Sequence, residues 1–224
     1  MNSLSNDRVM YRIILKNILV LLADWANGIF AILLASYLTG ADIVWWHFLV
    51  GIVFSHLLDL DAVPDLWRLG KVGGTEAGTD HRDGLHYPAL VLPVIGMSVF
   101  FFGYWGWILL FAVLLHFIND LYGTGWGIKL LWPFSDTKFK LLGRRVNQPK
   151  YILLENDLWD ELPHSERRLR FWVTWSAAEA PHYFRRYGME NWVEDYYLRG
   201  TVVAYIEYTL FLVAIAIAVM TVVS

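Results

Sequence analysis

The chain has 224 residues, of which 57% are hydrophobic and 17% are charged, and its formal net charge is -3. Soluble domains carry about 25% charged residues, so this composition indicates a polytopic membrane protein. Cysteine is absent, which excludes disulfides and thiolate metal sites and leaves His, Asp and Glu as the available ligands for any metal.

Five apolar stretches follow one another along the chain and predict its long helices. They are residues 17–39, 42–58, 88–102, 104–122 and 201–223. A membrane-spanning helix needs about 20 apolar residues, and the last stretch fits that length best. The third is short and begins at Pro88, so it predicts either a tilted span or half of a re-entrant hairpin, which ends at Gly103.

The fold class predicted from this pattern is all-α, a polytopic membrane helix bundle of about four to five transmembrane helices with a helical cytoplasmic cap. We divide the chain into four parts: an N-terminal cytoplasmic or interfacial segment (1–16), a membrane-embedded bundle (17–142), a cytoplasmic cap (143–200) and a C-terminal transmembrane helix (201–224).

Two helices are predicted inside the cap. They lie near residues 155–162 and 165–187, and the second is opened by Ser165 and Glu166.

The basic residues fall on one side of the membrane if the first four helices form two hairpins. All eighteen Lys and Arg then lie in the segments 1–16, 60–87 and 123–200. The positive-inside rule places these segments in the cytoplasm. We therefore expect a multi-pass protein of the inner, cytoplasmic membrane, with its N-terminus inside and its C-terminus outside.

Three short clusters of metal-ligand side chains fall at helix ends on that same side. They comprise His56, Asp59 and Asp61 after the second helix, His81 and His86 before the third, and His116 and Asp120 at the end of the fourth. Ionisable groups are costly in or near a bilayer, so such clusters indicate a functional site. Neutral imidazole with carboxylate is a ligand mixture that holds catalytic divalent metals.

Two of the clusters also have a structural interpretation. His116 and Asp120 are four residues apart and share a helix face, but a helix-terminal His with a capping Asp has the same spacing. Asp59 and Asp61 repel each other, and a bound cation would relieve this repulsion, although acidic residues are common at helix ends. His56 fits either a ligand or a core histidine.

Other polar residues leave similar alternatives open. His81 and His86 flank a predicted turn at Gly84 and would also fit an ordinary surface turn. Asp24 and Asn27 on the first helix could complete a polar centre, since helix bundles place sites on inward faces. His47 falls on the opposite side of the membrane and is predicted to belong to an aromatic belt.

Three segments resemble a known family. The stretch HRDGLHYP is similar to the His-Arg-x-x-Thr-His motif of the YdjM-like membrane-bound metal-dependent hydrolases, and LLHFINDLYGTGWGIKLLWPFS is similar to their Leu-x-His-x-x-x-Asp segment. The DLD sequence from Asp59 to Asp61 resembles their Pro-Asp-x-Asp motif. The resemblance covers residues 20–142. The chain departs from it at Leu58, Leu85 and Asn27, where the family has Pro, Thr and His.

The resemblance and the clusters together predict a metal-dependent hydrolase that acts at the cytoplasmic membrane interface on a lipid-linked or phosphoester substrate. One or two divalent ions, Zn or Mn with Mg as a further candidate, would be bound by the seven cluster residues named above. Asp61 and Asp120 are predicted to act as catalytic carboxylates, and Arg82 to stabilise negative charge on the substrate.

Two other functions remain open on the sequence. One is a non-enzymatic membrane scaffold with a structural metal site, which would have four protein ligands and no open position. The other is a small transporter.

We expect membrane lipids and a lipid or lipid-phosphate substrate as partners, and no nucleic acid.

Overall fold

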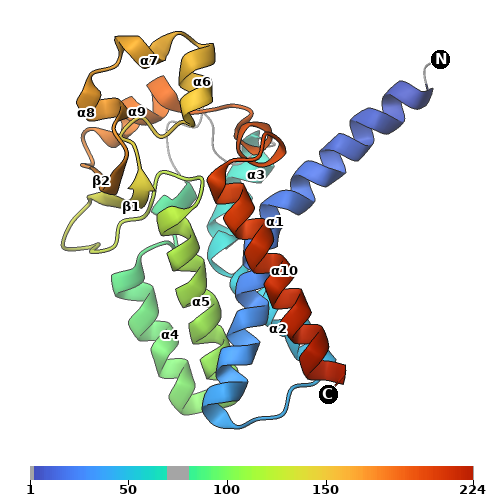
Figure 1. Cartoon of the computed structure of the whole chain (residues 1–224). Coiled ribbons are helices and arrows are strands. Elements are labelled where there is room, and N and C mark those ends of the chain that lie inside the picture. The colour runs from blue at the N-terminus through green and yellow to red at the C-terminus, as the bar shows by residue number, and fades with distance from the viewer. Residues whose placement is uncertain (1–2, 70–80, 224) are drawn as a thin grey trace.

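The computed structural model describes residues 3–69 and 81–223, with their side chains except those of 3–10, 12–13, 69 and 81. Its long helices form a bundle with a cap at one end (Figure 1). The bundle helices are α1 (Ser3–Thr39), α2 (Trp45–Ser55), α4 (Pro88–Phe102), α5 (Tyr104–Tyr122) and α10 (Val202–Val223). All five correspond to the apolar stretches predicted from the sequence.

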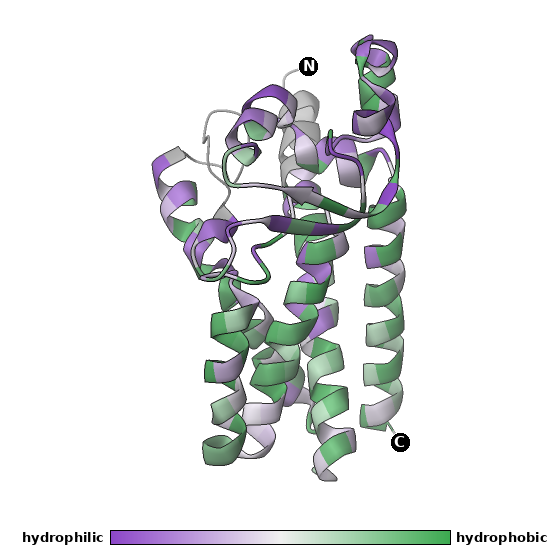
Figure 2. Cartoon of the chain, turned by 90° about the vertical axis from the view of Figure 1, so that its left-hand side faces the viewer, coloured by the Kyte–Doolittle hydropathy of each residue, from purple (hydrophilic) through white to green (hydrophobic). Residues whose placement is uncertain are grey.

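Three of these helices are long and apolar enough to cross a membrane. They are the Ile14–Thr39 part of α1, α5 and α10. A fourth span results if Trp45–Ser55 and Leu58–Arg68 are taken together, with a bend of 45° between them. Hydrophobic residues cover the helices while polar residues concentrate in the cap (Figure 2). The chain thus has the features of a multi-pass membrane protein.

Two helix hairpins, α1–α2 and α4–α5, make up most of the bundle, as predicted. The first turns after Gly40 and the second at Gly103, and both glycines have positive φ values, of 71° and 52°. Figure 1 shows both turns, and the C-terminal end of α10, at the end of the bundle opposite the cap. The connections that carry the three predicted ligand clusters therefore lie at the cap end.

The first hairpin is held together by a close backbone approach. A Cβ atom on Gly28 of α1 would lie 2.5 Å from the backbone of Gly51 in α2. Small residues at such a crossing allow two membrane helices to approach closely. The crossing lies one helical turn from Asp24 on α1 and one turn from the end of α2, so it brings Asp24 close to the residues that follow α2.

One stripe of α5 faces the interior of the bundle. Ile108, Ala112, His116 and Asp120 recur every four residues along it, and all four are buried. The first two pack against α1, where Ala35 is also fully buried. Because residues at i and i+4 lie above one another on a helix, the same packing aims His116 and Asp120 at the interior.

Short elements connect and cover the cap end of the bundle. After α2 come a 3₁₀ helix, η1 (Leu58–Ala62), and α3 (Val63–Leu69), and a further 3₁₀ turn, η2 (His81–Asp83), precedes α4. The cap itself contains α6 (Lys150–Glu155), α7 (Leu158–Glu161), α8 (His164–Arg167), α9 (Ala180–Tyr187) and the π-helical turn η3 (Glu194–Leu198).

A two-stranded antiparallel sheet also belongs to the cap, so the prediction of an all-α chain is wrong in this region, and the cap begins before the predicted boundary at residue 143. Strand β1 (Lys138–Gly143) pairs with β2 (Arg170–Trp175), with Lys138 opposite Trp175. The single helix predicted over 165–187 is replaced by α8, β2 and α9. The sequence RFWVTW is rich in aromatic and β-branched residues, which favour strands when a partner strand is available.

Candidate metal centre

The described members of the three clusters meet at the cap end of the bundle. The Nε2 atoms of His86 and His116 lie 3.2 Å apart. Oδ2 of Asp120 lies 3.3 Å from the first and 3.4 Å from the second. Oδ1 of Asp59 lies 3.9 Å and 3.6 Å from the same two nitrogens. Carboxylate oxygens of Asp59 and Asp120 thus both lie close to the facing nitrogens of His86 and His116, and these residues come from three separate parts of the chain.

These separations suit a small divalent cation. In a tetrahedral zinc site with bonds of about 2.0–2.1 Å, neighbouring ligand atoms lie about 3.3–3.4 Å apart. The triangle formed by His86, His116 and Asp120 has edges of 3.2–3.4 Å. Asp59 lies slightly further away and is the most exposed of the four residues, at 33% of its side chain against 0–4% for the others.

The second ring nitrogen of each histidine faces a carboxylate. Nδ1 of His86 lies 2.9 Å from Oδ2 of Asp61, and Nδ1 of His116 lies 2.8 Å from Oδ1 of Asp24. A carboxylate only accepts hydrogen bonds, so the proton of each neutral ring belongs on Nδ1. This is the usual arrangement behind metal-bound histidines.

The donor set itself therefore favours a cation. With both protons on Nδ1, the Nε2 lone pairs of His86 and His116 point at each other and at the oxygen of Asp120. Such an arrangement of electron-rich atoms is repulsive in a buried environment, and either a proton on one ring or a metal ion between the donor atoms removes the repulsion. The residues present fit a divalent metal of the Zn or Mn type.

A second layer of contacts orients Asp120 and Asp61. Nε of Arg82 lies 2.7 Å from Oδ1 of Asp120, which leaves Oδ2 directed at the histidines. Arg82 is in turn packed against the chain, because a Cβ atom on Gly125 would lie only 1.1 Å from its Nη1. The backbone N–H of Leu85 donates to Oδ2 of Asp61 at 2.7 Å.

The loop that holds Arg82 in place is attached to the cap. The buried Lys140 of β1 donates from Nζ to the carbonyl oxygens of Gly123 and, at 2.6 Å, of Gly125. Asn147 also donates to the Gly125 carbonyl, at 3.0 Å. A cation at this position also suits the C-terminal end of α5. The cap thus controls the shape of the loop beside the centre.

The structure separates the predicted site residues by position. His86, His116, Asp59 and Asp120 point at the centre. Asp61 contacts the Nδ1 side of His86, and Arg82 contacts Oδ1 of Asp120. Both residues therefore touch a candidate ligand and are not ligands themselves.

His56 lies beside the other oxygen of Asp59, with Nδ1 at 3.5 Å from Oδ2. The side chain of His81 lies outside the described residues. Asp24, which the sequence offered only as a way to complete a polar centre, faces His116 directly.

Two other polar residues of the bundle have partners of their own. His47 is buried at the opposite end, with Nδ1 at 3.2 Å from the Tyr104 hydroxyl and its ring against Trp105. Glu207 of α10 is buried and accepts a hydrogen bond from Asn119 of α5 at 3.3 Å. The second contact joins α10 to the helix that carries His116 and Asp120.

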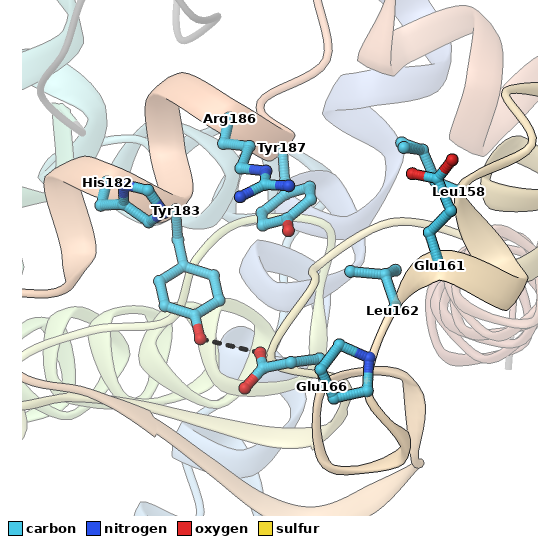
Figure 3. A pocket seen from close by; sticks show the side chains of 9 residues that line it. Leu158, Glu161, Leu162, Glu166, His182, Tyr183, Arg186 and Tyr187 are labelled. Atoms are coloured by element: carbon cyan, nitrogen blue, oxygen red, sulfur yellow. Dashed lines mark hydrogen bonds between the residues drawn. The ribbon is translucent and has the colours of Figure 1, made fainter.

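A separate cavity lies within the cap, away from these clusters in the sequence. Its volume is about 280 Å³, and its polar lining includes Glu161, Glu166, His182 and Arg186. The Tyr183 hydroxyl donates to Glu166 at 2.7 Å across it (Figure 3). The residues that line it belong to the cap alone, so it is not the opening of the His/Asp centre.

Comparison of the chain with known protein families, with curated proteins and with solved structures gave no match. What the structure shows is a buried His/Asp group in a membrane-type bundle. One donor atom each from Asp59, His86 and His116 lies within 4.8 Å of the others, so the group could hold a metal ion.

Proposed function

We propose that this chain is an integral membrane metal-dependent hydrolase of the YdjM-like type, with its centre at the cytoplasmic face of the inner membrane. The observation that supports this most directly is the triangle of His86 Nε2, His116 Nε2 and Asp120 Oδ2. Each imidazole in it is oriented by a carboxylate behind it. A buried triangle of this kind has the ligand composition of a catalytic zinc site.

The open position of the proposed site lies on the side of Asp59. Catalytic zinc sites keep three protein ligands and one exchangeable position. Asp59 is the furthest of the four donors from the histidines and the most exposed, so water and substrate reach the centre from its side. A bound ion would polarise the scissile group and lower the pKa of a bound water towards about 7.

The side chains around the ion would accept protons and orient its ligands. Asp59 lies at the open edge and is the carboxylate best placed to accept a proton from an incoming water. Asp61 orients His86, and Asp120 is a ligand oriented by Arg82. Arg82 then positions Asp120 through its Nε atom. Its predicted contact with the negative charge of the substrate would have to come from its Nη atoms, which lie next to Gly125.

The location of the centre favours an anionic substrate in the membrane. The centre lies beneath the cap, where α2 and α5 end and α4 begins, on the same side as the basic segments. A lipid-linked phosphoester offers a headgroup at this depth while its chains stay in the bilayer. Arginine and lysine near a cytoplasmic membrane surface also favour anionic headgroups.

Metal analysis of the detergent-purified chain tests the proposal. After incubation with Zn²⁺ or Mn²⁺ and removal of free ions, we expect stoichiometric metal in the wild type and loss of most of it in His116→Ala. The matched control is His164→Ala, because His164 is an exposed cap residue. Absence of metal in the wild type after loading would overturn the proposal.

Activity is then measured on phospholipids and lipid phosphates in mixed micelles. We expect hydrolysis by the metal-loaded wild type and its loss in Asp120→Asn, whose unfolding temperature should fall because Arg82 loses its buried charge partner. Metal-loaded protein that hydrolyses none of these substrates would count against the hydrolase function.

One observation favours a second candidate, a membrane scaffold with a structural ion. If Asp59 binds the ion as fully as the other three, the site has four protein ligands and is saturated. Removal of the ion would then lower the unfolding temperature strongly, since ligand binding to the folded state alone adds about 4 kcal/mol at a thousandfold excess over Kd. A large stability loss without any turnover would support the scaffold.

A further inference from the structure

Asp59 takes part in two groups of potential ligands at once. Its Oδ1 faces His86 and His116, at 3.9 Å and 3.6 Å from their Nε2 atoms. Its Oδ2 lies 3.5 Å from Nδ1 of His56, on the other side. Asp24, His56 and Asp59 form a second group, in which one donor atom from each lies within 4.8 Å of the others.

From this geometry we propose that Asp24, His56 and Asp59 bind a second divalent cation, with the Asp59 carboxylate bridging the two ions. This inference rests on the proposed function, because it extends the same centre. A carboxylate whose two oxygens face different ligand sets is suited to bridge two ions, which lie about 3.5–4 Å apart in two-metal hydrolases.

The local charge is consistent with two ions. Asp24, Asp59, Asp61 and Asp120 bring four negative charges to the centre, and Arg82 brings one positive charge. With neutral histidines the sum is -3, so one divalent ion leaves -1 and a second makes +1. Only the second ion gives these groups the sign that attracts a phosphoester.

The two ions would differ in access. The inner ligands His86, His116 and Asp120 are 0–4% exposed, whereas His56 and Asp59 are 29% and 33% exposed. The outer ion would have three protein ligands and open positions towards the surroundings. An ion with three protein ligands is the one that binds water and substrate. With both ions bound, the outer ion would therefore face the reaction, and Asp59 would serve as a bridging ligand in place of the base role that it has in the one-ion site.

The fold explains why these three residues meet. The backbone approach at Gly28 and Gly51 places α1 against α2, and Asp24 lies one turn from that crossing. α2 ends at Ser55, and His56 follows as its C-cap at the bend before η1. The bend turns η1 across the end of the bundle, which allows Asp59 to reach both groups.

Manganese binding to the full-length protein in detergent tests the second site. We expect two Mn²⁺ per chain in the wild type, with an electron paramagnetic resonance spectrum of spin-coupled ions. His56→Ala is expected to bind one Mn²⁺ with the spectrum of an isolated ion. His182→Ala, an exposed cap histidine, is the matched control and should bind two. If His56→Ala does not purify, His56→Gln replaces it.

The outcomes separate this inference from the proposed function. One Mn²⁺ per chain in the wild type, retained in the His56 variant and lost in His86→Ala, would overturn the second site and leave the inner centre in place. No bound Mn²⁺ or Zn²⁺ in the wild type would overturn both. Two ions that both remain in the His56 variant would also overturn the assignment.

Discussion

The Nε2 atoms of His86 and His116 lie 3.2 Å apart, although 30 residues separate the two histidines in the chain. One precedes α4 and the other lies on α5. Asp61 and Asp24 face the Nδ1 sides of the two rings, so the facing nitrogens of two neutral rings would both be acceptors. Either a proton on one ring or a metal ion between the two nitrogens would satisfy them.

Replacement of Gly125 by Ala is expected to weaken metal binding. Its Cβ would lie 1.1 Å from Nη1 of Arg82, so the guanidinium must leave its place beside Asp120. Loss of an outer partner typically costs about 10–100-fold in metal affinity, which competition with a chelating dye would measure. Gly96→Ala is the control, because no atom lies within 4 Å of its added Cβ. Equal affinities in both variants would contradict the role assigned to Arg82.

Asp61→Asn is expected to reduce metal affinity by about 10–100-fold while the fold is retained. Asparagine has almost the same shape, but it is uncharged and polarises the His86 ring less strongly. Its oxygen can still accept the N–H of Leu85. Isothermal titration with Zn²⁺ measures the change.

The control for Asp61→Asn is Asp157→Asn. Asp157 is exposed and has a φ of 57°, a conformation that asparagine accepts well. If Asp61→Asn binds Zn²⁺ as tightly as this control, Asp61 does not orient His86.

Gly28→Ala should destabilise the α1–α2 hairpin. The added methyl group would lie 2.5 Å from backbone atoms of Gly51 and Ile52, which have little freedom to move away. Overpacking of this kind costs about 1–3 kcal/mol, seen as a lower unfolding temperature by tryptophan fluorescence in detergent. Gly96→Ala again serves as control. An unchanged unfolding temperature would show that the two helices separate at little cost.

Lys140→Met is expected to loosen the cap from the bundle. The methionine fills a similar volume but donates no hydrogen bonds to the carbonyl oxygens of Gly123 and Gly125. The loss of charged hydrogen bonds should cost about 2 kcal/mol. Limited proteolysis of the loop after α5 and thermal unfolding measure the effect. Lys150→Met is the control, since Lys150 is exposed and lies over the Trp159 ring.

The apolar pattern of the sequence determined the bundle. The five stretches correspond to the five long helices, because a spanning helix needs a run of apolar residues that is visible locally. Hairpin connectivity then brought the three ligand clusters to one end. The spacing of His116 and Asp120 placed both on one helix face, since that depends only on the helical period.

The tertiary structure alone decided which atoms meet. Asp61 lies behind His86 while Asp59 faces the centre, and Asp24 approaches His116 only because Gly28 and Gly51 let two helices touch. The β1–β2 sheet joins strands about thirty residues apart. Such contacts depend on packing between segments that are distant in the chain, and a local sequence pattern does not indicate which distant segments pack together.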